Sequence, residues 1–212
     1  MWRAKLTGAD ERLGALLCEQ ERARAGRLLS ERSRLLWTRS RGLLRVLLGR
    51  YLHEDPRALR FAEEAHGKPL LLVPADRSPR GAGVGGVHVS FNLSHSGELA
   101  LYAFCAGAAV GVDVEGDRRS IDEVALAARV LGASEAAHLR AIADPAVRRR
   151  EFLKAWTRYE AQLKCLGTGI GAGASGLDRG RVWVADLDPG GGAAGAVACA
   201  REPRELRCWT WR

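Results

Sequence analysis

Three short segments in the middle of the chain alternate apolar residues with polar or small ones. They cover residues 87–93, 99–104 and 110–115, and Gly107 lies between the second and the third. Because side chains of a strand point alternately to its two faces, this period of two predicts β-strands. Strands that follow one another so closely favour antiparallel pairing, since parallel strands need long crossover connections. This run of strands limits the possible folds more than any other feature.

Segments with helical spacing flank the strands on both sides. Residues 11–52 carry leucines three and four positions apart among many arginines, which predicts an amphipathic helix with its arginines in solvent. Helix is also expected over 120–142 and over 151–166, where Gly167 stands in a C-cap position. Weaker strands are expected around 182–184, 196–198 and 208–211. Runs of helices and runs of strands, rather than strict alternation, predict an α+β fold.

Composition narrows the class of protein. Hydrophobic residues make up 47% of the 212 residues and charged residues 27%, as in globular proteins with a substantial core. No apolar run approaches the ~20 residues that span a bilayer, and no apolar stretch follows Met1 as in a signal peptide. We therefore expect a cytoplasmic protein that does not enter a membrane. The five scattered cysteines include no Cys-x-x-Cys pair, which argues against a zinc site or a disulfide framework.

The net charge of +8 favours an anionic partner. Nucleic acid, an anionic membrane, a polyphosphorylated small molecule and an acidic protein all fit this charge. Aromatic residues are only 6% of the chain, too few for an evident base-stacking surface. Charge alone therefore does not choose between these partners.

Asp113 and Glu115 are the first candidates for chemistry. They stand two apart in a predicted strand, so both carboxylates project from the same face, while Val110, Val112 and Val114 occupy the other. A solvated strand end would explain the pair without any function. Neighbouring carboxylates repel each other unless a cation or proton joins them, and Mg²⁺ prefers such oxygen ligands together with phosphate. The pair is thus a candidate magnesium site.

Two further groups could belong to the same site. Glu160 and Lys164 stand four apart on a predicted helix and share a face, as in an ordinary surface ion pair or as a metal ligand beside a phosphate-binding lysine. Ser94-His95-Ser96 follows a predicted strand and precedes Gly97, so we expect it at a turn, where hydroxyls and backbone N–H groups could hold an anion. No Gly-x-Ser-x-Gly motif marks a hydrolase nucleophile.

Taken in order, these motifs resemble those of the Sfp-type 4′-phosphopantetheinyl transferases, from about Glu21 to the end of the chain. The matching segments are Gly67-Lys68-Pro69, Phe91-Asn92-Leu93-Ser94-His95-Ser96, Gly111-Val112-Asp113-Val114-Glu115, and Phe152 to Ala161 followed by Lys164, Gly167 and Gly169. The resemblance implies an α+β fold of two similar halves related by a pseudo-twofold axis, with the active site between them. We place these halves at residues 1–106 and 107–212.

The resemblance also implies roles for individual residues. Asp113, Glu115 and Glu160 match the acidic residues that family members place around Mg²⁺, and Glu160 could also act as the base. Lys164 matches the lysine at the diphosphate of coenzyme A and is, with Glu160, a catalytic candidate. The coenzyme A contacts implied for this chain are Lys68, Pro69, Ser94, His95, Asp113 and Lys164, with Arg24 as our choice for the 3′-phosphate among Arg22, Arg24 and Arg27.

One position departs from the family pattern. Family members usually carry a lysine immediately before the helix glutamate, and this chain has Tyr159 there. If that lysine assists phosphate binding, its loss should weaken turnover unless Arg158 or Lys154 takes its place.

The resemblance implies Mg²⁺-dependent transfer of 4′-phosphopantetheine from coenzyme A to a serine of an apo acyl, polyketide or peptidyl carrier protein, by a monomer that binds neither nucleic acid nor membrane. Two alternatives remain at this stage. A Mg²⁺-dependent hydrolase of a nucleotide diphosphate would use the same acidic residues with water. A nucleic-acid binder would use the arginine-rich helix, although carboxylates repel a phosphate backbone unless a metal intervenes.

Overall fold

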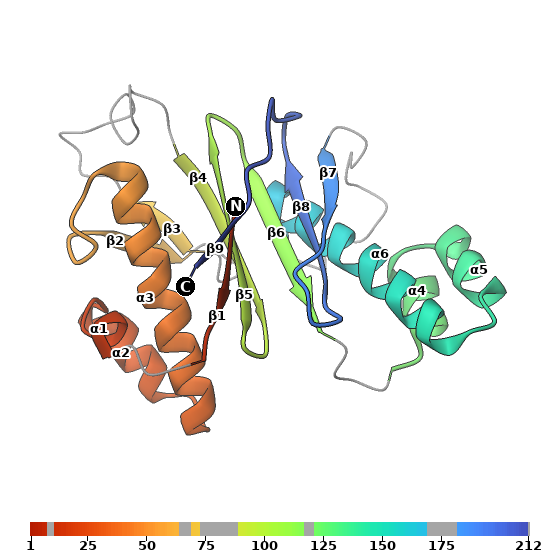
Figure 1. The fold of residues 1–212 in the computed structure, drawn as a ribbon, viewed down its shortest axis with the longest axis horizontal. Coiled ribbons are helices and arrows are strands. Elements are labelled where there is room, and N and C mark those ends of the chain that lie inside the picture. The colour runs from red at the N-terminus through yellow and green to blue at the C-terminus, as the bar shows by residue number, and fades with distance from the viewer. Residues whose placement is uncertain (8–10, 64–68, 73–88, 117–120, 169–181, 212) are drawn as a thin grey trace.

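The structure is a computed structural model that describes residues 1–7, 11–63, 69–72, 89–116, 121–168 and 182–211. These ranges form six helices and nine strands arranged in layers (Figure 1). Two sheets lie side by side in the middle, with long helices outside them. The α+β class predicted from the sequence is confirmed.

The first sheet contains both ends of the described chain. Its strand order is β4-β5-β1-β9. β4 and β5 form an antiparallel hairpin, β1 is antiparallel to β5, and β9 is parallel to β1. The strands are β4 (Val89–Ser96), β5 (Leu99–Ala106), β1 (Trp2–Lys5) and β9 (Trp209–Trp211). The parallel pairing of β1 and β9 places the C-terminal strand at the edge opposite to β4.

The second sheet has three antiparallel strands in the order β6-β8-β7. They are β6 (Val110–Glu115), β8 (Ala194–Cys199) and β7 (Trp183–Leu187). The turn between β7 and β8 uses three consecutive glycines with positive φ, Gly190, Gly191 and Gly192, a backbone conformation that glycine adopts without strain. A third, small sheet is the hairpin of β2 (Arg60–Glu63) and β3 (Pro69–Leu72).

Alternation along β5 explains how the layers pack. Ala100 and Tyr102 point to one face and pack with the buried leucines of α3 (Glu31–Leu52). Leu101 and Ala103 point to the other face and pack with the valines of β6. Each face of the strand is therefore buried, one against a helix and the other against the second sheet.

Helix α6 (Pro145–Leu166) covers the second sheet, packing on β6 and β8. It begins at Asp144, whose carboxylate accepts the N–H groups of Ala146 and Val147, and ends at Gly167 in the left-handed region with φ of 71°. Both ends follow the usual capping chemistry of helices. The helices α4 (Glu123–Val130) and α5 (Ala133–Ala141) pack beside its N-terminal half.

Four sequence predictions about these elements are wrong in detail. Within the described residues, the helix expected over 120–142 is two helices, α4 and α5, and the helix expected over 151–166 begins earlier, at Pro145. The predicted helix over 11–52 is three helices, α1 (Glu11–Gly14), α2 (Glu19–Gly26) and α3, because Ser30 caps α3 by accepting the Ser33 N–H at 3.0 Å. Ser94-His95-Ser96 lies within β4 and not at a turn, which starts at Gly97 with φ of 57°. Among the described helices, none has the length and apolar character that a membrane span requires.

Candidate active site

Side chains of β4 join the two sheets where their edge strands meet. Asn92 Oδ1 accepts the backbone N–H of Val112 at 2.9 Å, and Ser94 Oγ donates to Asp113 Oδ1 at 2.8 Å. Ser96 Oγ donates to Glu115 Oε2 at 3.2 Å and accepts the Gly116 N–H at 3.0 Å. Because residues two apart share a face of a strand, the three β4 side chains form one row along β6. We call the row Asn92, Ser94 and Ser96 the polar seam.

Asp113 lies at the centre of this arrangement. Its side chain is only 4% exposed, and its Oδ1 accepts hydrogen bonds from Ser94 Oγ and, at 2.5 Å, from Lys164 Nζ. Lys164 Nζ also donates to Ser94 Oγ at 3.1 Å, so the three side chains contact one another. The second oxygen, Oδ2, is buried and finds no hydrogen-bond partner among the residues that the structure describes. A buried carboxylate oxygen without a hydrogen-bond partner lowers the stability of the fold. Asp113 is therefore suited to bind a further ligand through this oxygen.

The close approach of α6 to β6 delivers Lys164 to Asp113. Gly111 stands two residues before Asp113 on the same face of β6, and a Cβ placed on it would lie 2.1 Å from the Ala161 carbonyl oxygen and 2.4 Å from the Cys165 nitrogen. Only glycine permits this backbone contact. The helix turn that carries Glu160 and Lys164 is therefore held directly against the strand that carries Asp113 and Glu115.

The pKa of Glu160 responds to partial burial and to the charges of Asp113, Glu115 and Lys164. Partial burial raises the pKa of the Glu160 carboxyl, and the negative charges of Asp113 and Glu115 raise it further, while Lys164 opposes them. A carboxylate senses its neighbours in this way only when they are near. We call Asp113, Glu115 and Glu160 the carboxylate site.

His95 lies next to this site on β4. Burial of part of its ring lowers the His95 pKa, and the positive charge of Lys164 lowers it further. The imidazole is therefore predominantly neutral at physiological pH, with one N–H to donate and one nitrogen to accept. A neutral ring can donate to a phosphate oxygen without adding charge.

The carboxylate site fits a divalent cation by its chemistry. Within the described ranges, no three His, Cys, Asp or Glu side chains stand close enough together to hold a metal as they are placed. However, Asp113 Oδ2 is buried without a hydrogen-bond partner among the described residues, and partial burial together with the charges of Asp113 and Glu115 raises the pKa of Glu160, while Lys164 lowers it. Carboxylate oxygens are the ligands that Mg²⁺ prefers. Asp113, Glu115 and Glu160 therefore supply oxygen donors of the kind that this ion takes.

The other residues predicted to bind coenzyme A lie on different elements. Arg24 is on α2, with its guanidinium 5.8 Å from the ring centre of Trp37. Pro69 is the first residue of β3, paired with Glu63. Figure 1 shows both elements on the far side of β4 from α6. Lys68 lies outside the described residues.

Tyr159 occupies the position where the sequence predicted a departure from the family pattern. Its side chain is buried, and its ring packs at 6.2 Å from that of Trp156. The two proposed substitutes for the missing lysine already have partners: Arg158 bonds both oxygens of Asp186, and Lys154 pairs with Glu151 at 2.9 Å. Position 159 thus serves the packing of α6.

The hydrogen bonds of Asn92 and Ser96 to β6 were not predicted from the sequence. Both residues lie in the polar seam beside Ser94, which was predicted. The available signal was the period of two itself, because Asn92, Ser94 and Ser96 put polar groups on one face of a strand. A polar face on a central strand indicates partners within the protein, since unpaired polar groups are rarely buried.

Comparisons with known proteins find a matching family model and related proteins. A family model described as the 4′-phosphopantetheinyl transferase superfamily matches residues 109–210, which include β6 and α6. The chain is 36% identical over 173 residues to the 4′-phosphopantetheinyl transferase HetI of Nostoc sp., covering 80% of this chain and 69% of that protein.

Two further relatives match less of their own length. A protein of Synechocystis sp., slr0495, is 31% identical over 159 residues, which are 75% of this chain and 60% of the relative. A phosphopantetheinyl transferase of Thraustochytrium sp. is 30% identical over 174 residues, which are 76% of this chain and 56% of the relative.

Proposed function

This chain belongs to the 4′-phosphopantetheinyl transferase superfamily, and from that premise we propose that it moves the 4′-phosphopantetheine group of coenzyme A onto a serine of an apo carrier protein. The second product is adenosine 3′,5′-bisphosphate. One observation carries the proposal: the contact of Lys164, Asp113 and Ser94, with Glu160 in electrostatic range. It combines a phosphate-binding cation with carboxylates suited to a metal, as phosphoryl transfer requires.

Asp113, Glu115 and Glu160 are the proposed ligands of Mg²⁺. When bound, Mg²⁺ supplies charge neutralisation for the diphosphate of coenzyme A. Asp113 fits this role because its Oδ2 is buried without a partner. Ser96 holds the carboxylate of Glu115 through its hydroxyl, and Ser94 holds that of Asp113.

Lys164 and Glu160 are the proposed catalytic residues. The Lys164 ammonium binds an oxygen of the diphosphate and offsets the negative charge that develops on the leaving group. The Glu160 carboxylate accepts the proton of the carrier serine as its hydroxyl attacks the β-phosphate. Without a bound cation, partial burial and the negative charges of Asp113 and Glu115 raise the pKa of Glu160 above that of an ordinary glutamate. The nucleophile comes from the partner, and none is required from this chain.

The remaining coenzyme A contacts are proposed for side chains around β4. Ser94 and His95 meet the phosphates, where the neutral His95 ring donates an N–H. Lys68 and Pro69 contact the adenosine portion, and Arg24 contacts the 3′-phosphate.

The partner and setting follow from charge and architecture. A net charge of +8 suits both coenzyme A and carrier proteins with acidic helices, because opposite charge accelerates encounter. The polar seam and the carboxylate site come from a single chain, which supports action as a monomer. We place the reaction in the cytoplasm, where coenzyme A and apo carrier proteins meet.

The test is transfer to apo carrier proteins, followed by mass spectrometry. With coenzyme A and Mg²⁺, the carrier should gain about 340 Da, the mass of the transferred group. Chelation of the metal should stop the gain, and added Mg²⁺ should restore it. The Asp113→Asn variant should lose at least about 100-fold in rate, because one metal ligand loses its charge.

Asp186→Asn is the matched control. Asp186 and Asp113 both pair with Ala196 of β8, from opposite sides, but Asp186 bonds Arg158 at the surface. This variant should retain the rate of the unchanged protein. If coenzyme A is cleaved at the same rate without a carrier, the protein is a hydrolase and the proposal is wrong.

A further inference from the structure

Two thiols face each other at the end of the sheets away from the carboxylate site. Cys105 lies near the end of β5 and Cys199 is the last residue of β8, so they belong to different sheets. Their sulfur atoms are 3.5 Å apart. A disulfide bond measures about 2.05 Å, so a closure of about 1.5 Å would join them.

A surface pocket gives access to this pair. The pocket has a volume of about 330 Å³, and both Cys105 and Cys199 line it beside the rings of Phe104 and Trp183. Cys105 is partly exposed, whereas Cys199 is only 3% exposed. A reagent entering the pocket therefore meets Cys105 first and has Cys199 behind it.

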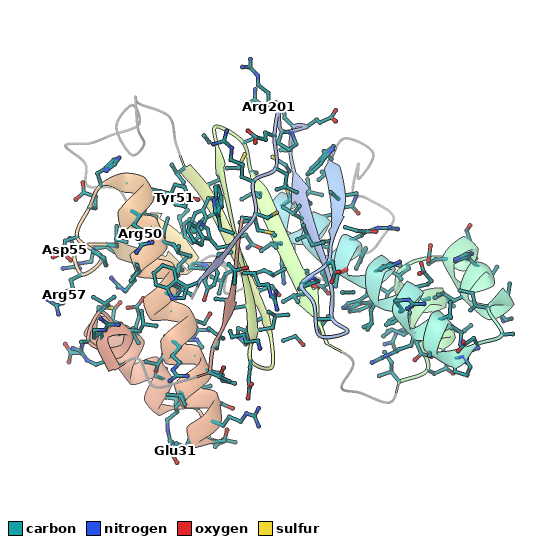
Figure 2. All side chains as sticks on the ribbon, in the orientation of Figure 1. Glu31, Arg50, Tyr51, Asp55, Arg57 and Arg201 are labelled. Atoms are coloured by element: carbon teal, nitrogen blue, oxygen red, sulfur yellow. The ribbon has the colours of Figure 1, made fainter. Side chains whose placement is uncertain are left out.

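The pair is separate from the proposed reaction. Cys105 pairs with Ser90 of β4, four residues before Ser94, which corresponds to about 13 Å along the strand. Both β5 and β8 end on the side of the molecule where Arg201 is labelled (Figure 1 and Figure 2). Neither thiol is needed for phosphoryl transfer.

We propose that Cys105 and Cys199 are a redox-sensitive modification site that closes to a disulfide by exchange with a small-molecule disulfide, linking the first sheet to the second. The link would cross-link residues 94 positions apart in sequence, a long loop whose closure restricts the unfolded chain. The proposal does not depend on the transferase activity.

The exchange takes two steps. The Cys105 thiol gives up its proton, and its sulfur attacks one sulfur of the small disulfide, so that a mixed disulfide forms and one small thiolate leaves and takes up a proton. Cys199 then loses its proton and attacks the Cys105 sulfur, which releases the second small thiol. Two protein thiols are oxidised, and one small disulfide is reduced to two thiols.

The surroundings set the rate of this exchange. Burial raises the pKa of the Cys105 thiol to about 11, and its contact with Cys199 contributes to the rise. The thiolate is therefore scarce at neutral pH, so the first step should accelerate about tenfold for each pH unit up to that pKa. Because exposed Cys208 shares none of this burial, it should react faster but form no internal link.

The experiment is oxidation with glutathione disulfide, followed by mass spectrometry of peptides prepared under acidic, non-reducing conditions. The expected product joins the Cys105 and Cys199 peptides, has lost two hydrogen atoms, and is reversed by a phosphine reductant. The oxidised protein should melt at least about 5 °C above the reduced protein, as expected for a cross-link across a long loop.

Single replacements supply the controls. Cys208→Ser should leave both the cross-link and the rise in melting temperature unchanged, whereas Cys105→Ser and Cys199→Ala should each remove both. If a variant folds poorly, the peptide map of the unchanged protein still shows whether the Cys105–Cys199 cross-link forms. Glutathione retained on Cys105 without ring closure, a cross-link of Cys105 to Cys165, or an unmodified pair after full oxidation of Cys208 would each overturn the proposal.

Discussion

At the scale of single residues, Asp113 and Lys164 form an ion pair in which only one partner is deeply buried. Asp113 is almost completely buried, while the Lys164 side chain remains 30% exposed. Burial of one charge is tolerated because the other lies 2.5 Å away and because Ser94 bonds to both. The ammonium is thus held against Asp113 and Ser94, where the proposed mechanism has it bind a phosphate oxygen.

We predict that Lys164→Met lowers both the stability of the protein and its activity. Loss of the ammonium leaves Asp113 buried without its cation, so the free energy of unfolding should fall by about 2 kcal/mol. Transfer should fall by about 100-fold, because the diphosphate loses a charged contact. Urea unfolding measures the first effect, and mass spectrometry of the carrier measures the second.

Two companion variants sharpen this prediction. Lys154→Met removes a lysine of the same helix that pairs with Glu151 at the surface, and it should change neither quantity appreciably. In the double variant Asp113→Asn with Lys164→Met, no uncompensated carboxylate remains, so stability should recover while transfer stays absent. Full activity of Lys164→Met would remove this residue from the mechanism.

At the scale of elements, the contact of α6 with β6 depends on the absence of a side chain at Gly111. We predict that Gly111→Ala lowers the free energy of unfolding by about 3 kcal/mol, because the methyl group would collide with the backbone of Ala161 and Cys165. Transfer should fall as well, since the helix must move away from Asp113. Thermal unfolding and the carrier assay measure these effects.

Gly26→Ala is the control for a general effect of replacing glycine. Gly26 ends α2, and a Cβ there would meet nothing within 4 Å. This replacement should be neutral or stabilise the protein slightly, because alanine restricts the unfolded chain. Equal melting temperatures for Gly111→Ala and the unchanged protein would contradict the role assigned to this contact.

The contact of Glu21 of α2 with the arginines of α3 should make the free energy of unfolding depend on pH. Burial alone would raise the pKa of Glu21, but hydrogen bonds from Arg41, Arg45 and the Cys18 N–H outweigh it and lower the pKa below 4.5. A lowered folded-state pKa contributes stability above the unfolded value, and this contribution disappears as the pH falls through the folded pKa. Arg45 is fully buried, so its partner matters.

We therefore predict that Glu21→Gln destabilises the protein by about 3 kcal/mol near neutral pH, because Arg45 loses its counter-charge. The difference from the unchanged protein should shrink as the pH falls below 4.5 and through the lowered folded-state pKa of Glu21, where Glu21 itself becomes protonated. Urea unfolding across this range measures it. Glu19→Gln, an exposed neighbour on the same helix, should show no such pH dependence; a constant gap at all pH values for Glu21→Gln would refute the assignment.

The elements differ in how far the sequence could predict them. The three central strands and most of α6 were predictable, because their patterns are long and Gly167 is a local C-cap signal, whereas the first turns of α6, from Pro145, were not predicted. β1 was not predictable, because its four residues form a strand only by pairing with β5, almost a hundred positions away in the sequence, and with β9, which is farther still. The turn expected at Ser94-His95-Ser96 was wrong for a related reason: polar residues there indicated exposure, whereas they bond to β6 across the polar seam.

The candidate site was predictable to a different degree. The resemblance and the spacing along strand and helix are enough to select Asp113, Glu115, Glu160 and Lys164 from the sequence. The spacing could not show that Lys164 bonds Asp113 instead of Glu160, four residues before it on the same helix, because that choice depends on how closely α6 approaches β6. The division into halves at residue 106 stays a prediction, and β9, from the second of those halves, pairs within the first sheet.

At the scale of the whole molecule, the two ends of the chain close the first sheet together. β9 pairs with β1, and the ring of Trp209 stacks on that of Trp2 at 5.2 Å. Arg50 of α3 lies over Trp211 at 4.7 Å, and Tyr51 accepts a hydrogen bond from Trp2 at 2.9 Å. Figure 2 shows Arg50 and Tyr51 next to each other where α3 faces this part of the sheet. The C-terminal strand therefore joins the helix layer to the sheet.

This architecture predicts that stability and activity separate on truncation. A chain ending at Cys208 loses β9 with two tryptophans, and its melting temperature should fall by roughly 5–10 °C. The site should survive, because β9 and β4 occupy opposite edges of the first sheet and the polar seam lies along β4. Below the lower melting temperature, the rate of transfer to a carrier protein should match that of the full chain.

A chain ending at Trp211 is the control for this truncation, because it changes the same terminus but keeps the strand. Its melting temperature should equal that of the full chain. Calorimetry and the carrier assay, both on purified protein, measure the two quantities. If the chain ending at Cys208 remained folded but lost its transfer activity, the edge strand would be coupled to the carboxylate site across four strands, and the assignment of β9 to stability alone would be wrong.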